Sequence, residues 1–366
     1  MLGPATDPQI VKLRDFAHVQ EDREVMKQVR GEPANASPAD GKLTERLSRR
    51  RFLVSLGLVA GAGAAGTLSW RARARGAHRI EASRAGLGTW IRIVARHEDP
   101  ARAERAISRA FRAIDQVDGQ MSIHRSDSEL ARVNHAAGER AVPVSAALLE
   151  VVARAREGSL ATGRVYDPTV LPLMRLFGFY DSGRTHMPAD REIAATLDAM
   201  GPHLIAIDRV AGTLGLTRRG AGLDLGAIGK GWAVDRAVDA LRAEGVTSGL
   251  VDVGRNVYGL GTPDEESAGW RVGVLHPTTG DVDRVFTLND SAVATSGNYE
   301  QWETLDGVRV GHVLDALHGR PANPHLSATV HARSGFDSDN ASSIAFLVGR
   351  RVTTIVPGVL DVHFIG

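Results

Sequence analysis

A glycine-rich junction between an apolar stretch and a helix constrains the fold of this chain more than any other segment. Residues 223–235 read Leu-Asp-Leu-Gly-Ala-Ile-Gly-Lys-Gly-Trp-Ala-Val-Asp and predict a short strand, a turn and then a helix over 233–244 that Gly245 ends. Glycine allows close backbone approach, and the first N–H groups of a helix attract an anion. Lys230 adds a mobile positive charge. The pattern matches neither the P-loop nor Gly-x-Gly-x-x-Gly, so phosphate binding and an ordinary glycine turn both stay open.

Charge and cysteine content exclude several classes of function. The 44 basic and 43 acidic residues give a formal net charge of +1, and aromatic residues make up 5% of the chain. Neither a basic excess nor an abundance of stacking side chains therefore indicates a nucleic acid as partner. The chain has no cysteine. This excludes disulfides, thiolate nucleophiles, iron–sulfur clusters, cysteine zinc sites and a lipoprotein anchor.

The N-terminal part of the chain is predicted to lie outside the folded domain. Residues 1–47 are polar and charged, which predicts disorder. Residues 48–77 combine an arginine run, an apolar Gly/Ala-rich run over 54–68 and the small-residue site Ala-Arg-Ala at 72–74, and this order resembles a twin-arginine export signal. A membrane anchor is the alternative, but the apolar run is shorter than the roughly 20 residues that a span needs. The signal predicts a protein exported to the periplasm or the outer face of the membrane, and tethered there if the signal is not cleaved.

The remaining residues, 78–366, predict one α+β domain. Helical spacing of apolar residues alternates along the chain with short β-type runs. Besides 233–244, the predicted helices cover 100–117, 144–160, 190–200 and 341–348. The predicted strands cover 91–95, 249–253, 270–275, 285–288, 308–310 and 328–331, with a hairpin of 204–208 and 213–217. This mixture predicts mainly antiparallel sheets with flanking helices.

Two loop segments carry further candidate chemistry. Residues 166–169, Tyr-Asp-Pro-Thr, form a rigid turn for which a structural Asx turn is the competing interpretation. Residues 294–299, Ala-Thr-Ser-Gly-Asn-Tyr, offer small side chains where a ligand can approach. His312, followed by Asp315, suits a general base with an orienting carboxylate, although a lone histidine after a strand is more often structural. The motif Gly-x-Ser-x-Gly is missing, so no serine triad is supported.

Oxygen ligands gather where the last helix is predicted to begin. Residues 337–343 read Asp-Ser-Asp-Asn-Ala-Ser-Ser. Asp339 and Ser343 are one helical turn apart and therefore lie on one face. Hard oxygen ligands suit Mg²⁺ rather than Zn²⁺, with Mn²⁺ as an alternative ion. Because Asp and Ser are also common helix N-caps, capping is the competing interpretation.

The order of these motifs resembles the ApbE family of FAD:protein FMN transferases over roughly residues 85–350. The resemblance begins with Met121-Ser122, continues through Ser128-Glu129 and reaches Asn134. It then follows the segments 166–169, 224–231 and 295–297, the pair His312 and Asp315, and the stretch from Asp339 to Ser343. Each motif is weak alone, and their shared order makes the resemblance specific.

The resemblance implies an α+β flavin transferase fold with FAD held in a cleft and Mg²⁺ at its pyrophosphate. Carried over by position, the implied FAD contacts are Met121, Val165, Tyr166, Asp167, Asp224, Lys230 and Leu314. The implied metal ligands are the Ala227 carbonyl, Asp339 and the Ser343 hydroxyl. His312 matches the histidine implicated in catalysis, with Asp315 expected to orient it.

The resemblance also implies the reaction and the partners. A Ser or Thr hydroxyl of an acceptor protein attacks the FMN phosphorus of FAD, and AMP leaves. The expected acceptor is a secreted flavoprotein or a membrane redox subunit that carries a Ser/Thr flavinylation motif. An exported enzyme fits acceptors of this kind.

The sequence departs from the family at several positions near the implied site. Residues 316–319 read Ala-Leu-His-Gly where the family has Pro-x-Thr-Gly, Ser343 replaces a threonine, Ser338 replaces an alanine, and Arg255 replaces the second glycine of Gly-Gly-Asn. These departures leave two alternatives open. One is a Mg²⁺-dependent FAD pyrophosphatase that gives FMN and AMP, and the other is a non-enzymatic periplasmic protein that binds flavin.

Overall fold

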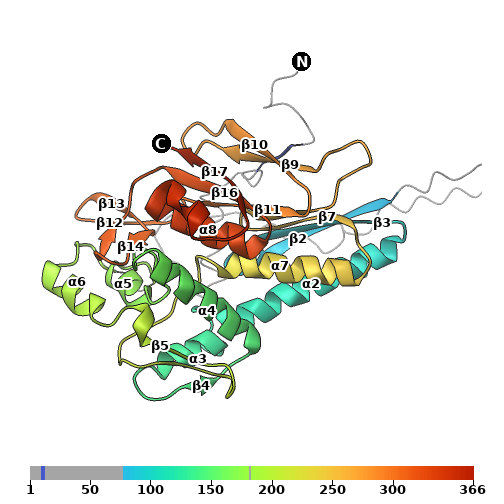
Figure 1. Ribbon diagram of the computed structural model, residues 1–366. Helices are drawn as coiled ribbons and strands as arrows, with labels where there is room; N and C mark the ends of the chain where they lie inside the picture. The colour runs from blue at the N-terminus through green and yellow to red at the C-terminus, as the bar shows by residue number, and fades with distance from the viewer. Residues whose placement is uncertain (1–9, 13–76, 181–182) are drawn as a thin grey trace, which may run out of the picture.

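The computed structural model describes residues 10–12, 77–180 and 183–366 (Figure 1). The predicted export signal over 48–77 lies outside the described residues except for its last one, so its prediction stands as made. Within the described part of the chain, no helix combines the length and the apolar character needed to cross a membrane.

A seven-stranded antiparallel sheet forms the centre of the domain, as predicted from the sequence. Its strand order is β17-β16-β11-β8-β7-β3-β2. The strands are β2 (His78–Gly86), β3 (Thr89–His97), β7 (Ser248–Val253), β8 (Asn256–Leu260), β11 (Ser291–Ser296), β16 (Ser327–Ala332) and β17 (Val359–Ile365). Side chains alternate between its faces, so that Ile93 and Ala95 enter the main core while Val94 enters a smaller core on the opposite face.

Three helices cover the main-core face, and Figure 1 shows them side by side along the sheet. They are α2 (Pro100–Met121), α7 (Gly229–Ala243) and α8 (Gly335–Val348). Helix α2 begins because the Asp99 carboxylate accepts a hydrogen bond from the Ala101 N–H at 2.9 Å. Its buried residues recur every three or four positions, which is the pattern that predicted it: Ala103, Ala106, Ile107, Ala110, Ile114 and Val117.

A second, three-stranded sheet covers the opposite face. It contains β9 (Trp270–Leu275), β10 (Val282–Leu288) and β1 (Ile10–Lys12). Strand β1 pairs in parallel with β9 and lies inside the 1–47 segment that was predicted to be disordered.

The remaining elements build a smaller part at one end of the sheet (Figure 1). They include α3 (Glu129–His135), α4 (Ala146–Ala161), α5 (Leu171–Leu176), α6 (Asp190–Leu197) and the 3₁₀ turn η2 (Pro202–Leu204), whereas the 3₁₀ turn η3 (Gly349–Thr354) packs on α8 and leads into β17. The predicted hairpin is present as β5 (Ile205–Asp208) and β6 (Thr213–Leu216), joined by β4 (Val142–Pro143). Two short ribbons complete this part: β12 (Trp302–Leu305) with β13 (Val308–Gly311), and β14 (Leu314–Asp315) with β15 (Arg320–Pro321).

Two predicted helices begin earlier in the chain than expected. Helix α7 begins at Gly229 rather than at residue 233, and α8 begins at Gly335 rather than at residue 341. Glycine is a poor helix former, so its presence in both first turns shifted the prediction. The reason for these glycines is the close contact between the two helix starts. A Cβ atom on Gly231 would lie 2.2 Å from the Gly335 carbonyl oxygen.

Each of these two helices caps the other. Asp235 of α7 accepts hydrogen bonds from the backbone N–H groups of Gly335 at 2.6 Å and Phe336 at 2.9 Å. Asp339 of α8 accepts one from the Gly231 N–H at 2.8 Å. Free N–H groups at two helix starts are therefore satisfied across one interface.

The substitution Gly231→Ala should destabilise the domain by about 1–3 kcal/mol, because the added methyl must displace the Gly335 backbone. Urea unfolding measures the change. Gly119→Ala is the matched control, since Gly119 is also helical and has no atom within 4 Å of its missing Cβ. It should raise stability by up to about 1 kcal/mol. Equal stability of the Gly231→Ala variant and the wild type would contradict the close contact.

Asp235 should give the free energy of unfolding a recognisable pH dependence. Burial raises the pKa of Asp235 from 3.8 to about 6. Because the folded state holds this proton more tightly, the stability it contributes is full below pH 3.8 and is lost as pH rises through about 6. At 1.36 kcal/mol per unit, the contribution is at most about 3 kcal/mol.

Urea unfolding between pH 4 and 7 tests this. The stability difference between wild type and Asp235→Asn should change across that range. A constant difference for Asp235→Asn would show that this carboxyl group does not titrate as the structure requires.

Candidate functional site

The apolar stretch that enters the glycine-rich turn is extended but is not a strand. The Asn134 side chain holds the Leu223 backbone from both sides: its Oδ1 accepts from the Leu223 N–H at 2.7 Å, and its Nδ2 donates to the Leu223 carbonyl at 2.9 Å. The Asp224 N–H donates to the Pro168 carbonyl at 2.8 Å. The short strand predicted before this turn is therefore wrong, because a side chain and a turn supply the hydrogen bonds that a neighbouring strand would give.

The turn itself is organised by Asp224. Its Oδ1 accepts from the Gly226 N–H at 2.8 Å, and its Oδ2 accepts from the Tyr180 hydroxyl at 2.5 Å. The Lys230 ammonium donates to the Gly226 carbonyl at 3.0 Å. Tyr180 was not among the predicted site residues, because no sequence pattern distinguishes it from other tyrosines.

Asp339 joins this turn from helix α8. Asp339 is 4% exposed, and its carboxylate accepts from the Gly231 N–H and lies with Oδ1 3.9 Å from the Lys230 ammonium. Burial raises the pKa of Asp339, while Lys230 and the Gly231 N–H lower it. The competing prediction, N-capping of the last helix, is met by Ser334, whose hydroxyl accepts from the Asp337 N–H at 3.0 Å. Asp339 instead lies within α8 and caps α7.

A group of serine hydroxyls lies one turn along α8 from Asp339. Ser343 Oγ is 3.1 Å from Ser296 Oγ, and Ser342 Oγ is 2.8 Å from the same atom. Ser296 ends β11 and belongs to the 294–299 segment singled out in the sequence. Two motifs that are well separated in the chain therefore meet here.

The donor chemistry at this place fits a magnesium ion. Within the described residues no group of three His, Cys, Asp or Glu side chains could hold a metal alone. The predicted ligands Asp339, Ser343 and the carbonyl of Ala227, in the glycine-rich turn, offer a carboxylate, a hydroxyl and a carbonyl oxygen. Magnesium is usually held by one or two carboxylates together with phosphate oxygens of the substrate, so such a sparse all-oxygen set suits it.

His312 directly follows β13 and is held by the backbone of Gln301. The Gln301 carbonyl accepts from the His312 N–H at 3.2 Å and lies 3.3 Å from its Nδ1. Because a carbonyl can only accept, this contact requires the proton on Nδ1 and leaves Nε2 as the basic nitrogen. Burial lowers the pKa of His312 below 6.5, while the carboxylate of Glu300 raises it.

Asp315 has a different partner from the one predicted. Its Oδ2 lies 2.8 Å from His318 Nδ1, and its Oδ1 accepts from the N–H groups of Leu317 and His318, both at 3.0 Å. The carboxylate thus organises the turn that follows it. In this geometry the Gln301 carbonyl, and not Asp315, orients His312.

The other predicted FAD contacts lie in buried or hydrogen-bonded positions of the fold. Val165 contacts the loop between β14 and β15, where its carbonyl accepts from the Ala316 N–H at 3.0 Å. Leu314, one strand residue earlier than Asp315, is buried there, and Met121 is buried at the end of α2. Asp167 forms the Asx turn that was the competing interpretation of its segment, accepting from the Thr169 N–H at 2.9 Å.

Tyr166 shows that the acidic residues converge. Burial raises the pKa of its hydroxyl, and the carboxylates of Asp339, Asp167 and Asp224 raise it further. The pKa of His312 in turn responds to Asp224 and Lys230. The residues from the separate sequence motifs therefore share one electrostatic environment.

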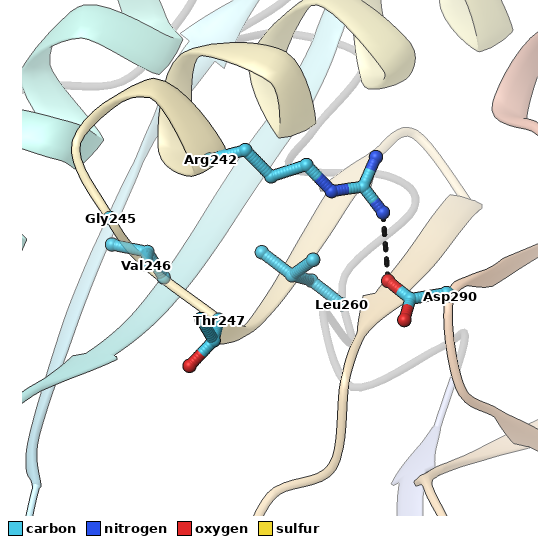
Figure 2. Close-up of a pocket in the computed structure, with 6 residues that line it drawn as sticks. All are labelled: Arg242, Gly245, Val246, Thr247, Leu260 and Asp290. Atoms are coloured by element: carbon cyan, nitrogen blue, oxygen red, sulfur yellow. Dashed lines mark hydrogen bonds and ion pairs between the residues drawn. The ribbon is translucent and has the colours of Figure 1, made fainter.

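A hollow of about 270 Å³ lies at the opposite end of helix α7 (Figure 2). Figure 2 shows the ion pair between Arg242 and Asp290, 2.8 Å apart, at its wall. Its other lining residues are Gly245, Val246, Thr247 and Leu260. None of the predicted site residues lines it, and the length of α7 separates it from the glycine-rich turn.

Comparisons with known proteins identify the family of this chain. The model of the ApbE family matches residues 87–356. A FAD:protein FMN transferase of Treponema pallidum is 33% identical over 299 residues, covering 78% of this chain and 82% of the relative. One of Salmonella typhimurium is 32% identical over 270 residues, covering 72% and 77%.

Solved structures show the same fold. The ApbE protein of Thermotoga maritima superposes with a TM-score of 0.71 at 27% identity, covering 78% of this chain and 94% of that one. The flavin transferase ApbE of Vibrio cholerae superposes with a TM-score of 0.68, also at 27% identity, covering 79% and 98%. Motif order, fold and family match agree, and this chain belongs to the ApbE family.

Proposed function

We propose that this protein transfers FMN from FAD to a Ser or Thr hydroxyl of an acceptor protein and releases AMP. The observation that carries the proposal is the meeting of Lys230, Asp339 and the first N–H groups of α7 at one glycine-rich turn. Relatives that are FAD:protein FMN transferases align over most of the chain. A pyrophosphate is the group that such a turn suits best.

The glycine-rich turn and its neighbours would supply a positive charge for the phosphate oxygens and oxygen ligands for a metal ion. The Lys230 ammonium provides positive charge for the phosphate oxygens, since the Gly231 N–H at the start of α7 is already bonded to Asp339. Asp339, Ser343 and the Ala227 carbonyl would hold Mg²⁺, which supplies charge neutralisation at the pyrophosphate when bound. Asp224 and Tyr166 would contact FAD beside it.

His312 is suited to take the proton of the acceptor hydroxyl. Its lowered pKa keeps the ring neutral at pH 7, with Nε2 free to accept. The acceptor oxygen forms a new bond to the FMN phosphorus, and the bond from that phosphorus to the AMP oxygen breaks. The products are a phosphoester-linked FMN on the acceptor and AMP, with the hydroxyl proton left on His312.

The departures from the family pattern are compatible with this activity. The turn over 316–319 is held by Asp315, which accepts from the Gly319 N–H through its carbonyl at 2.9 Å and binds His318 through its side chain. Ser343 keeps the hydroxyl that a threonine would provide. The turn therefore keeps its shape by contacts of its own.

We also propose that the protein works outside the cytoplasm. The signal predicted over 48–77 supports export by the twin-arginine machinery, which carries folded proteins. The acceptor would then be a secreted flavoprotein or a membrane redox subunit with a Ser/Thr flavinylation motif.

Incubation of the purified protein with FAD, Mg²⁺ and a candidate acceptor tests transfer. The acceptor should gain the mass of an FMN group, and EDTA should prevent the gain. His312→Ala should slow transfer by about 10²–10⁴-fold, the usual contribution of a general base, with FAD affinity retained. His78→Ala, at the start of the edge strand β2, is the control and should be fully active.

The pH profile gives a second check. Because burial lowers the pKa of His312, the rate should decline only below pH 6.5. FMN and AMP in solution beside an unmodified acceptor would favour the pyrophosphatase. If FAD stays intact with Mg²⁺ and several acceptors, the protein is a flavin-binding carrier and not an enzyme.

A further inference from the structure

Arg255 occupies a backbone conformation that its side chain does not favour. It follows Gly254 in the two-residue turn between β7 and β8, and the φ angles of the two residues are 56° for Gly254 and 71° for Arg255. Turns of this kind favour glycine at the second position, because left-handed backbone brings Cβ close to the chain. An arginine retained there suggests that its side chain has a role that offsets the strain.

The Arg255 guanidinium pairs with Glu300. The two side chains approach to 2.5 Å and are 29% and 31% exposed. The negative charge of Glu300 is also the largest cause of the raised pKa of Arg255. The β7–β8 turn is thereby tied to the loop over 297–301, which joins β11 to β12.

The same loop bonds to His312 and to its neighbour Val313. At one end, Asn298 Oδ1 accepts from the Val313 N–H at 2.8 Å, and Asn298 Nδ2 donates to Asn323 Oδ1 at 2.7 Å. At the other end, the Gln301 carbonyl accepts from His312. Glu300 lies between these two anchors, so its partner Arg255 holds the middle of the loop.

Charge gives Arg255 a second effect on His312. The charged groups that act on the ring are Glu300 and Asp224, which favour its protonation, and Lys230, which opposes it. An unpaired Glu300 would favour the imidazolium form, which cannot accept a proton. The guanidinium of Arg255 offsets this negative charge.

We propose that Arg255, acting through Glu300, is a positioning residue that keeps His312 neutral and in the Nδ1–H form. This inference rests on the proposed function only for the role of His312 as base. The arrangement itself is a property of the protein without FAD.

Nuclear magnetic resonance of the histidine rings tests this in the full chain without FAD. His312→Gln identifies the His312 signal among the 13 histidines. The wild type should show the proton on Nδ1 and a pKa below 6.5. Arg255→Gly should raise that pKa and mix the two tautomers, whereas Glu300→Gln should lower it. Arg255→Lys should restore the wild-type signal while keeping the strained backbone.

Asp361→Asn is the matched control, because it breaks another Arg–carboxylate pair, with Arg284, on β17. It should leave the His312 signal unchanged. If Arg255→Gly fails to fold, the nearly isosteric Glu300→Gln still decides the question. Unchanged pKa and tautomer in Glu300→Gln would overturn the proposal.

Transfer kinetics at pH 7 provide the second readout. Arg255→Gly should lower kcat by about 10–100-fold with the KM for FAD unchanged, as expected for misplacing a reacting group. A rise in KM alone would show that Arg255 contacts FAD and would overturn the positioning role. A wild type that transfers no FMN would refute the proposed function, yet the ring signals would still test the arrangement around His312.

Discussion

The crossing of α7 and α8 at their first turns is the contact on which the rest of the structure depends. Gly231 and Gly335 let the two backbones meet, and Asp235 and Asp339 each cap the other helix. Neither helix could begin where it does without the other, since their first N–H groups would lie buried without acceptors. The crossing also buries the carboxyl groups of Asp235 and Asp339. Loss of hydration makes their charged forms less favourable, which is why the pKa of each is raised.

The same crossing builds the site. Asp339 satisfies the start of α7 with one oxygen and faces Lys230 with the other, so the helix cap and the candidate magnesium ligand are one side chain. A turn further along α8, Ser343 reaches Ser296 at the end of β11. His312, whose pKa responds to the Lys230 charge, is held by the loop that follows β11. The chemistry of the site is thus a consequence of how the helices pack on the sheet.

The sequence predicted the antiparallel α+β fold, the hairpin of β5 and β6 and the family, because these follow from periodicity and motif order. It did not predict the early starts of α7 and α8, since their glycines contradict helix propensity until the partner helix is known. The role of Asn134 depends on Leu223, 89 residues further along the chain, which no local pattern encodes. Asp315 binds the turn that directly follows it, and the family motif directed attention to His312 instead. Glu300 belongs to no sequence motif. Only its ion pair with Arg255 and its electrostatic effect on His312 indicate its role.

The central claim, that Asp339 joins the helix crossing to a magnesium-dependent FAD site, is tested most directly by FAD affinity with and without Mg²⁺. Flavin fluorescence should report at least about tenfold tighter binding with Mg²⁺ in the wild type, equivalent to about 1.4 kcal/mol. Asp339→Asn should lose this gain. Asp337→Asn, which lies on the same helix and binds Arg154 instead, should keep it. An equal magnesium effect in the wild type and in Asp339→Asn, or no effect in the wild type, would contradict the account.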